Sequence, residues 1–332
     1  MDIRLIVPGN VRHGSGGNKY NAKLAEHLEA HGAAVETVTV DGGWPVGSPA
    51  DRQRFADALD GGTTVIADGL VASGAPDEVA AAVGNGTRVW ILSHMALAEH
   101  PTLEGKALAA ATGVICPSNH AAGELRARHG RSGTVVARPG TEAAGEANGS
   151  EPPHLVAVAA LLPNKQQTLI VEALASLQDL SWTAALIGSH DADPAYAAEV
   201  AAAVERHGLE GRLEVTGELT GTPLERQWLA ADLSLLASTS ESFGMVVVES
   251  LAHGVPALVK EGTGAVEALG SSGAGQAVKI AGPGDLAKTI RAWLTDESLR
   301  TEWRQAALMS RHTLPGWDAT ARTVLDALTA DA

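Results

Sequence analysis

Short apolar runs alternate with amphipathic segments through the first half of the chain. The apolar runs fall at residues 3–7, 35–40, 63–67, 88–92 and 114–116. Between the first two runs, Asn18–His31 carries Leu24 and Leu28 four residues apart on one helical face, and Gly32 follows as a helix C-cap. Buried strands that alternate with helices predict a parallel sheet covered on both faces, an α/β architecture.

The same alternation restarts after residue 153. Strands are predicted at 155–159, 183–187, 213–216, 233–237 and 257–259, with helices at 168–176, 195–207, 223–231 and 245–253 between them. Two helical stretches close the chain, 286–310 with a break near Asp296, and 317–330 after the sharp turn at Pro315-Gly316. The second half therefore predicts a second α/β unit.

A compositional break separates the two halves. Residues 140–153, GTEAAGEANGSEPP, are rich in glycine, small polar residues and acids, which is typical of an interdomain linker. We expect one Rossmann-like domain over 1–148, a second over 149–312, and a final helical segment over 313–332. Two such domains would face each other across a cleft at the carboxyl ends of their sheets, where ligands of these folds bind.

Charge and cysteine content exclude several function classes. The net charge of the 332-residue chain is −15, so neither nucleic acid nor an anionic membrane surface is an expected partner. No apolar run reaches membrane-spanning length and the first residues do not resemble a signal peptide, so we expect a cytoplasmic protein. The single cysteine, Cys116, excludes an internal disulfide and fits a buried, inert thiol.

The segment ESFGMVVVE places two glutamates, Glu241 and Glu249, around a predicted helix start. Gly244 permits an open backbone there, and the first-turn N–H groups of Gly244, Met245 and Val246 would form an anion site for a diphosphate. A carboxylate beside a phosphate would bind hydroxyls instead, so Glu249 suits a ribose diol and Glu241 suits the transferred sugar. The alternative is two solvated glutamates that flank an ordinary helix.

Two further features suggest ligand contacts in the first half. Gly14, Gly16 and Gly17 precede a helix and would let backbone approach a phosphate or an acceptor, although a flexible loop without a ligand stays open. The pattern is not G-x-G-x-x-G, so no dinucleotide cofactor is expected. His94 follows the strand at 88–92, and neither the acids nor the histidines cluster as a metal cage requires.

The motif ESFGMVVVESLAHGVP, with its Glu-x7-Glu spacing, resembles the signature of family-four retaining glycosyltransferases with the GT-B fold. The resemblance covers nearly the whole chain. It extends to the glycine-rich loop, to the Pro139-Gly140 and Thr216-Gly217 pairs, and to Glu267. It implies a nucleoside diphosphate sugar as co-substrate, no other cofactor, no metal, a small acceptor, and a last helix that crosses back to the first domain.

The resemblance also implies roles for individual residues. Glu241, His94 and Lys165 would be catalytic, with His94 touching the donor sugar and Lys165 the leaving diphosphate. The donor-binding residues would be Glu249, Phe243, Gly244, Met245, Val246, Gly16, Gly17, Gly188 and Leu219. On the acceptor side, the implied residues are Asn18 and His13.

The chain departs from the family pattern where the family has an arginine beside the lysine. Ala160 stands at the arginine position, Asn164 is uncharged, and Thr263 replaces the first glycine of a Gly-Gly-x-x-Glu loop. Another cation such as Arg12, Lys19 or Arg138 would compensate, or activity would be weak. Besides a retaining glycosyltransferase, two alternatives stay open: a sugar-nucleotide-binding protein without turnover, and a GT-B sugar-nucleotide epimerase.

Overall fold

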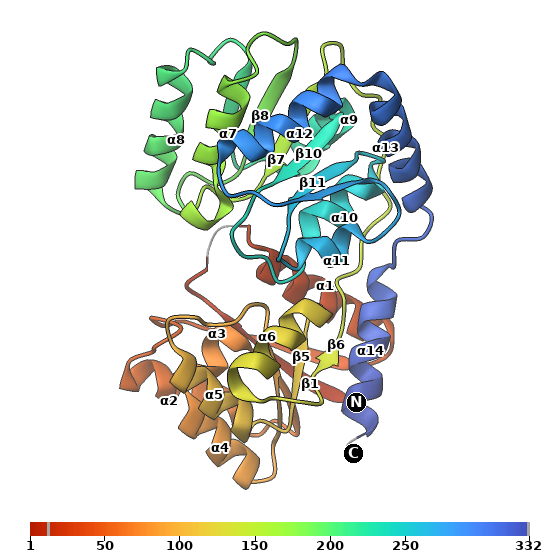
Figure 1. Ribbon diagram of the computed structural model, residues 1–332. Coiled ribbons are helices and arrows are strands. Elements are labelled where there is room, and N and C mark those ends of the chain that lie inside the picture. Colours follow the sequence, from red (N-terminus) through yellow and green to blue (C-terminus); the bar gives the residue numbers. More distant parts are fainter. Residues whose placement is uncertain (12–13, 331–332) are drawn as a thin grey trace. The chain divides into compact units, whose positions relative to one another are not determined.

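The computed structural model describes residues 1–11 and 14–330 and divides into two compact units (Figure 1). The first unit comprises Met1–Gly140 together with Pro315–Ala332, and the second comprises Thr141–Leu314. Each unit contains one six-stranded sheet whose paired strands are all parallel. The α/β fold with two Rossmann-like parallel sheets, predicted from the alternation of apolar runs and helices, is confirmed.

The sheet of the first unit has the strand order β2-β1-β3-β4-β5-β6. In chain order the strands are β1 (Asp2–Pro8), β2 (Ala34–Val40), β3 (Thr64–Asp68), β4 (Arg88–Leu92), β5 (Gly113–Cys116) and β6 (Val135–Val136). From β1 the chain continues to β2 on one side of the sheet. From β3 it continues to β4 on the opposite side. The topological switch point of this sheet therefore lies between β1 and β3.

Helices cover both faces of the first sheet. They are α1 (Gly16–Ala30), α2 (Pro49–Leu59), α3 (Gly69–Ala72), α4 (Pro76–Gly84), α5 (Pro101–Ala110), α6 (Asn119–His129) and α14 (Trp317–Ala330). Residues from α2 to α6 join one apolar cluster with the strands, including Phe55, Val79 and Leu108. The other face carries α1, and the C-terminal helix α14 packs on α1 and on β6.

The sheet of the second unit has the strand order β12-β11-β10-β7-β8-β9. Its strands are β7 (His154–Val158), β8 (Thr183–Ile187), β9 (Leu213–Gly217), β10 (Leu233–Leu236), β11 (Ala257–Lys260) and β12 (Gly275–Val278). From β7 the chain continues to β8 on one side of the sheet. From β10 it continues to β11 on the opposite side. The switch point of this sheet therefore lies between β7 and β10.

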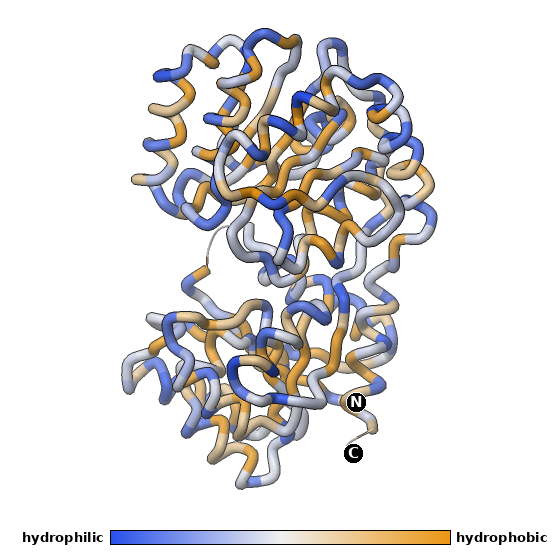
Figure 2. Tube along the Cα trace, viewed as in Figure 1, coloured by the Kyte–Doolittle hydropathy of each residue, from blue (hydrophilic) through white to orange (hydrophobic). Residues whose placement is uncertain are grey.

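The helices of the second unit also form two layers. They are η1 (Pro163–Lys165), α7 (Gln167–Ala175), α8 (Pro194–Arg206), α9 (Gly221–Ala230), α10 (Met245–Ala252), α11 (Ala265–Leu269), α12 (Pro283–Thr295) and α13 (Glu297–Ser310). One apolar cluster joins the strands to α7, α8 and α12, and a second joins them to α10 and α11. The hydrophobic positions gather on the strands and on the inward faces of these helices (Figure 2).

The chain divides at Gly140, before the boundary at residue 148 that the composition suggests. Residues 141–148 belong to the second unit because their backbone is bonded to it. Ala147 is buried and its N–H donates to the His253 carbonyl at 2.9 Å, while Asn148 N–H donates to Leu229 O at 2.8 Å. The segment looks like a linker in sequence, yet its backbone is bonded to the last turn of α9 and to the C-cap of α10.

Most predicted elements are present, and the differences are local. The helical stretch over 286–310 is broken at Asp296 as predicted, because this residue ends α12 and its side chain caps α13 through Leu299 N–H at 3.0 Å. The edge strands β6 and β12 and the short helix α11 were not predicted. Their runs of two to five residues are too short for periodicity to identify them.

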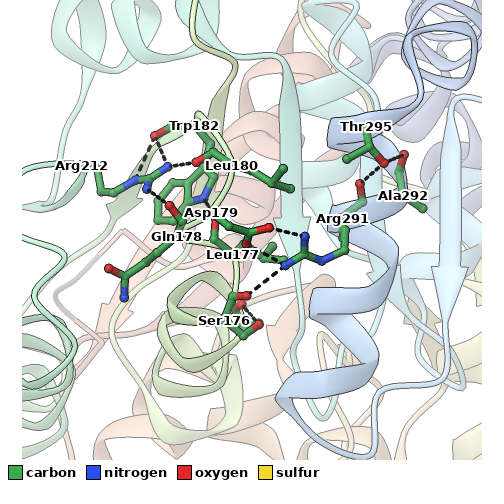
Figure 3. A network of polar contacts seen from close by, with 11 residues as sticks. Ser176, Leu177, Gln178, Asp179, Leu180, Trp182, Arg212, Arg291, Ala292 and Thr295 are labelled. Atoms are coloured by element: carbon green, nitrogen blue, oxygen red, sulfur yellow. Dashed lines mark hydrogen bonds and ion pairs between the residues drawn. The ribbon is translucent and has the colours of Figure 1, made fainter.

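In the second unit, a polar network joins the segment after α7 to Arg212, which precedes β9, and to Arg291 of α12 (Figure 3). The guanidinium of Arg212 lies 3.8 Å above the Trp182 ring and donates to the carbonyls of Gln178, Leu180 and Trp182. Arg291 pairs with Asp179 at 2.7 Å and 2.8 Å. The contacts of Arg212 are stabilising because one planar cation bonds several carbonyls and stacks on an aromatic ring at the same time.

Candidate functional site

The loops at the switch point of the second sheet bring together residues that are far apart in sequence. The loop after β7 spans residues 159–166, and the loop after β10 spans 237–244. They are joined by the backbone N–H of Thr239, which donates to Asn164 O at 2.8 Å. Ligands of open parallel sheets bind outside the carboxyl ends of the strands at such a point.

Lys165 and Glu241 form an ion pair across these two loops. Lys165 Nζ donates to Glu241 Oε1 at 2.6 Å, and the two side chains are 22% and 13% exposed. Because β7 and β10 are neighbours in the sheet, the two residues meet although they are 76 positions apart. Both belong to the predicted catalytic set, and the structure places them in direct contact.

The start of α10 lies next to this pair. Gly244 is the N-cap, with φ +87°, a conformation that favours glycine, and its position lies against Ala265 of α11. Met245 and Val246 open the helix, so their N–H groups have no carbonyl one turn earlier within it. The helix start therefore presents backbone donors and a positive dipole end beside Lys165 and Glu241.

The other residues of the second unit that were predicted to bind the donor differ in what their side chains contact. Phe243 is buried in the apolar cluster of α10 and α11, which leaves its backbone for any ligand contact. Glu249 lies in α10, and its carbonyl accepts both the N–H and Nδ1 of His253, at 3.2 Å and 2.8 Å. Leu219 packs on the cluster that contains Trp228.

Gly188 has a packing requirement of its own. A Cβ at this position would lie 1.9 Å from the carbonyl oxygen of Ala159, so no larger residue fits without moving the loop after β7. Its N–H donates to Gly217 O at 2.9 Å, which ties the ends of β8 and β9 together. The glycine thus holds the loop that contains Lys165 close to the sheet.

The departures from the family pattern are accommodated locally. Ala160 contributes no charge, and its carbonyl accepts from Gln167 Nε2 at 3.0 Å. Thr263 is buried and bonds Lys260 O at 3.0 Å, while Gly264 makes the close approach to Ser242. The loops keep their fold without the missing glycine, and the missing cation is not replaced by Ala160 or Asn164.

In the first unit, three polar side chains meet at the carboxyl ends of the strands. His94 Nε2 lies 2.8 Å from Asn21 Oδ1 and 3.5 Å from Asp68 Oδ2, and Asn21 Nδ2 donates to Asp68 Oδ2 at 2.7 Å. Asn21 comes from α1, Asp68 ends β3, and His94 follows β4. Burial lowers the pKa of His94, and the nearby Asp68 carboxylate opposes this shift.

The glycine-rich start of α1 lies against His94. Ser15 caps the helix by accepting from Asn18 N–H at 3.1 Å, and Asn18 Nδ2 donates to Val11 O at 2.9 Å. A Cβ at Gly17 would be 3.2 Å from the His94 ring, so the glycine permits this close approach. Gly16 is the first residue of α1. The predicted acceptor-side residue His13 and the candidate cation Arg12 lie outside the described residues.

Sequence reasoning did not identify Asn21 and Asp68. Asp68 carries a usable signal, since a carboxylate directly after a predicted parallel strand is placed at the ligand edge of the sheet. Asn21 carries none, because a polar residue within an amphipathic helix is ordinarily solvated. Two histidines one turn apart, His27 in α1 and His31 at its C-cap, were also not identified; both contact Asp318 of α14, at 3.0 Å and 3.3 Å.

Two features are absent from the residues that the structure describes. No group of three or more His, Cys, Asp or Glu side chains within 1–11 and 14–330 has an arrangement that could hold a metal ion. No helix in the same ranges is both long and apolar enough to cross a membrane.

Comparison with known sequences identifies a family for the second unit. The profile described as "Glycosyl transferases group 1" matches residues 141–309. A D-inositol 3-phosphate glycosyltransferase from Thermomonospora curvata is 37% identical over 109 residues, which is 32% of this chain and 25% of that relative. A protein of the same name from Jonesia denitrificans is 29% identical over 170 residues, 49% of this chain and 39% of that relative. These matches span well under half of each relative's length.

Comparison with solved structures extends the likeness to the whole chain. Sucrose-phosphate synthase from Thermosynechococcus elongatus superposes with a TM-score of 0.82 at 18% identity and covers 100% of both chains. HepE from Anabaena, solved with UDP and glucose, gives a TM-score of 0.80 at 19% identity and covers 99% of this chain and 100% of that chain. At these identities the likeness shows the fold, which is GT-B. Because the family profile matches half of its residues, the chain belongs to the group 1 glycosyl transferases.

Proposed function

We propose that the protein transfers a glycosyl group from a nucleoside diphosphate sugar to a small acceptor, with retention at the anomeric carbon. The proposal rests on one observation above the others. Lys165, Glu241 and the N-terminus of α10 meet at the switch point of the second sheet. A cation and free backbone donors suit a diphosphate, and a carboxylate suits sugar hydroxyls or developing positive charge.

The chemical contribution of this site would be electrostatic. As the glycosidic bond to the diphosphate breaks, negative charge grows on the leaving group and positive charge on the sugar. Lys165 and the first-turn N–H groups of α10 would stabilise the negative charge on the leaving group. Glu241 would stabilise the positive charge on the sugar. Glu249 would bind the ribose, and His94 would contact the transferred sugar. None of these roles requires a metal ion.

Ligand binding tests the donor class first. The protein would be heated with UDP-, GDP-, ADP- and dTDP-sugars, and a donor present at 100 times its dissociation constant should stabilise the fold by about 2.7 kcal/mol. Release of the nucleoside diphosphate would then be followed with and without acceptors. D-Inositol 3-phosphate is the first acceptor to try, because curated relatives carry that name. Failure of every sugar nucleotide to bind would contradict the proposal.

A second candidate is a protein that binds a sugar nucleotide without turning it over. It is favoured by the charge at the site: Glu241 neutralises Lys165, and Ala160 stands where the family has an arginine. The leaving diphosphate would then meet little net positive charge from these two loops. Stabilisation by a sugar nucleotide, with no diphosphate released in the presence of any acceptor, would favour this candidate over the enzyme.

A further inference from the structure

The polar cluster of the first unit is buried more deeply than a surface hydrogen-bond network. Asn21 and Asp68 are only 3% and 4% exposed, and they come from α1 and the end of β3. Buried polar groups must satisfy one another's donors and acceptors, because water does not reach them. This requirement determines which atom of each group carries a proton.

The direction of the hydrogen bonds follows from Asp68. Its Oδ1 accepts the Leu70 N–H at 2.9 Å, and its Oδ2 accepts Asn21 Nδ2 at 2.7 Å. A carboxylate has no proton to donate, so the amide NH₂ of Asn21 must face Asp68 and its carbonyl oxygen must face His94. That oxygen, Oδ1, only accepts, and it lies 2.8 Å from His94 Nε2. His94 therefore carries its proton on Nε2.

The edge of the imidazole that carries Nδ1 is left for a ligand. The Cδ2 edge faces Gly17, and Tyr20 packs edge-on with ring centroids 5.1 Å apart. Among the described residues, 1–11 and 14–330, Nδ1 of His94 has no hydrogen-bond partner, and the side chain stays 17% exposed. A neutral imidazole with its proton on Nε2 bears a lone pair on Nδ1.

We infer that Asn21 and Asp68 are positioning residues that fix His94 as the neutral Nε2–H tautomer, so that Nδ1 accepts a hydrogen bond from a sugar hydroxyl. This inference rests on the proposed function for the nature of the ligand, but not for the tautomer. Under it, His94 offers neither a proton nor a positive charge to the reaction. Its contribution is to hold and orient one hydroxyl of the ligand.

The surroundings of the ring agree with a neutral form. Among the described residues, the titratable groups that contact it are Asp68 and Tyr20. Tyr20 donates its hydroxyl proton to Ala137 O at 2.7 Å, and burial raises its pKa, so it stays un-ionised. Burial likewise disfavours the imidazolium form of His94.

The tautomer is measured by ¹⁵N-detected NMR of the full chain labelled at histidine, near pH 7.5. His94 should show a protonated Nε2 and an unprotonated Nδ1. His253 provides a contrast in the same spectrum, since its Nδ1 faces the acceptor-only carbonyl of Glu249 at 2.8 Å and must carry a proton. An unprotonated Nε2, or an imidazolium, at His94 in the wild-type protein would by itself overturn the inference.

Variants test the two positioning residues. Asp68→Asn keeps an oxygen that can cap Leu70 but adds a donor, so Asn21 can turn over and His94 should show a mixture of tautomers. Asn21→Ala removes the nearer acceptor and leaves Asp68 Oδ2, 3.5 Å from Nε2, so a smaller share of the other tautomer should appear. This variant serves if the first fails to fold. An Nε2–H tautomer that persists unmixed in the folded variants would show that these residues do not fix it. His253 should be unchanged in both.

Calorimetry tests the ligand contact with UDP-glucose and UDP as probes. His94→Ala should weaken UDP-glucose about tenfold, the scale of one well-placed hydrogen bond, and leave UDP unchanged, because UDP lacks the glucosyl group. Asp68→Asn should weaken UDP-glucose less, by about twofold if half of the molecules keep the Nε2–H tautomer. Equal weakening of both probes, or of neither, would refute the hydroxyl contact. If the wild-type protein binds neither probe, the proposed function fails for uridine donors, and the NMR result still decides the tautomer.

Discussion

Replacement of Lys165 by alanine is the most direct test of the proposed donor site. Lys165 is the cation that the loop after β7 retains, and its Nζ lies 2.6 Å from Glu241 Oε1. The substitution removes the positive charge from the switch point and leaves Glu241, whose side chain is 13% exposed, without its partner. Two separate losses are expected, one in stability and one in the chemical step.

The two losses have different sizes. An unpaired, partly buried carboxylate costs about 1–2 kcal/mol of unfolding free energy, which is less than for a fully buried pair because solvent screens it. The loss of charge opposite a departing diphosphate should lower turnover by roughly 10²-fold, or about 2.7 kcal/mol of transition-state stabilisation. The second loss should exceed the first.

A double-mutant cycle separates the diphosphate role from the ion pair. Turnover would be measured as release of nucleoside diphosphate for Lys165→Ala, Glu241→Gln and the double variant, and unfolding by urea for the same proteins. If Lys165 contacts the diphosphate, its removal should still lower turnover in the Glu241→Gln background. Lys288→Ala, at an exposed lysine of α12, is the matched control and should change neither quantity.

Two outcomes would refute the reasoning. Near-wild-type turnover of Lys165→Ala would show that the diphosphate is held elsewhere. A Lys165→Ala effect that vanishes in the Glu241→Gln background would show that the lysine only positions the glutamate. Ala160→Arg supplies the complementary test, because it should raise turnover if the site lacks a cation and should do nothing if another group already fills that place.

Four further predictions follow from the same geometry. Glu249→Ala should raise the Michaelis constant for the donor with a smaller effect on turnover, and unchanged affinity for the free nucleoside diphosphate would remove the ribose role. Excess EDTA should leave turnover intact, whereas complete loss restored by magnesium or manganese would contradict the proposed metal-independent mechanism. Arg212→Ala should lower the free energy of unfolding by about 2 kcal/mol because several carbonyls lose their donor. Arg291→Ala should lower it less, because the pair with Asp179 is exposed, and equal urea midpoints of the two variants would refute this difference. Burial lowers the pKa of His94 from 6.5, so its contribution to stability is present above pH 6.5 and is lost as pH falls through the folded-state pKa. His94→Gln should therefore flatten the decline of the unfolding free energy on the acid side, by up to about 1.4 kcal/mol per pH unit, as measured by urea unfolding; an unchanged slope would contradict this.

Much of the architecture could be predicted from the sequence because it depends on neighbouring residues. Short apolar runs that alternate with amphipathic helices indicate buried parallel strands, and the observed strands fall on those runs. The break at Asp296 and the helix start at Gly244 are likewise local, since capping and positive φ depend on one or two residues. The edge strands β6 and β12 escaped because pairing with a neighbour, rather than their own pattern, makes them strands.

The contacts that make a site were decided only by the tertiary structure. Strand order places the loop after β7 beside the loop after β10, and this order brings Lys165 to Glu241 across 76 positions. In the first unit, α1, β3 and β4 bring together Asn21, Asp68 and His94, of which only His94 was predicted to have a role. A periodic pattern records whether a residue is buried, but not which distant residue it meets. The order of the strands decides that, because it selects which loops become neighbours and which buried polar groups must satisfy one another.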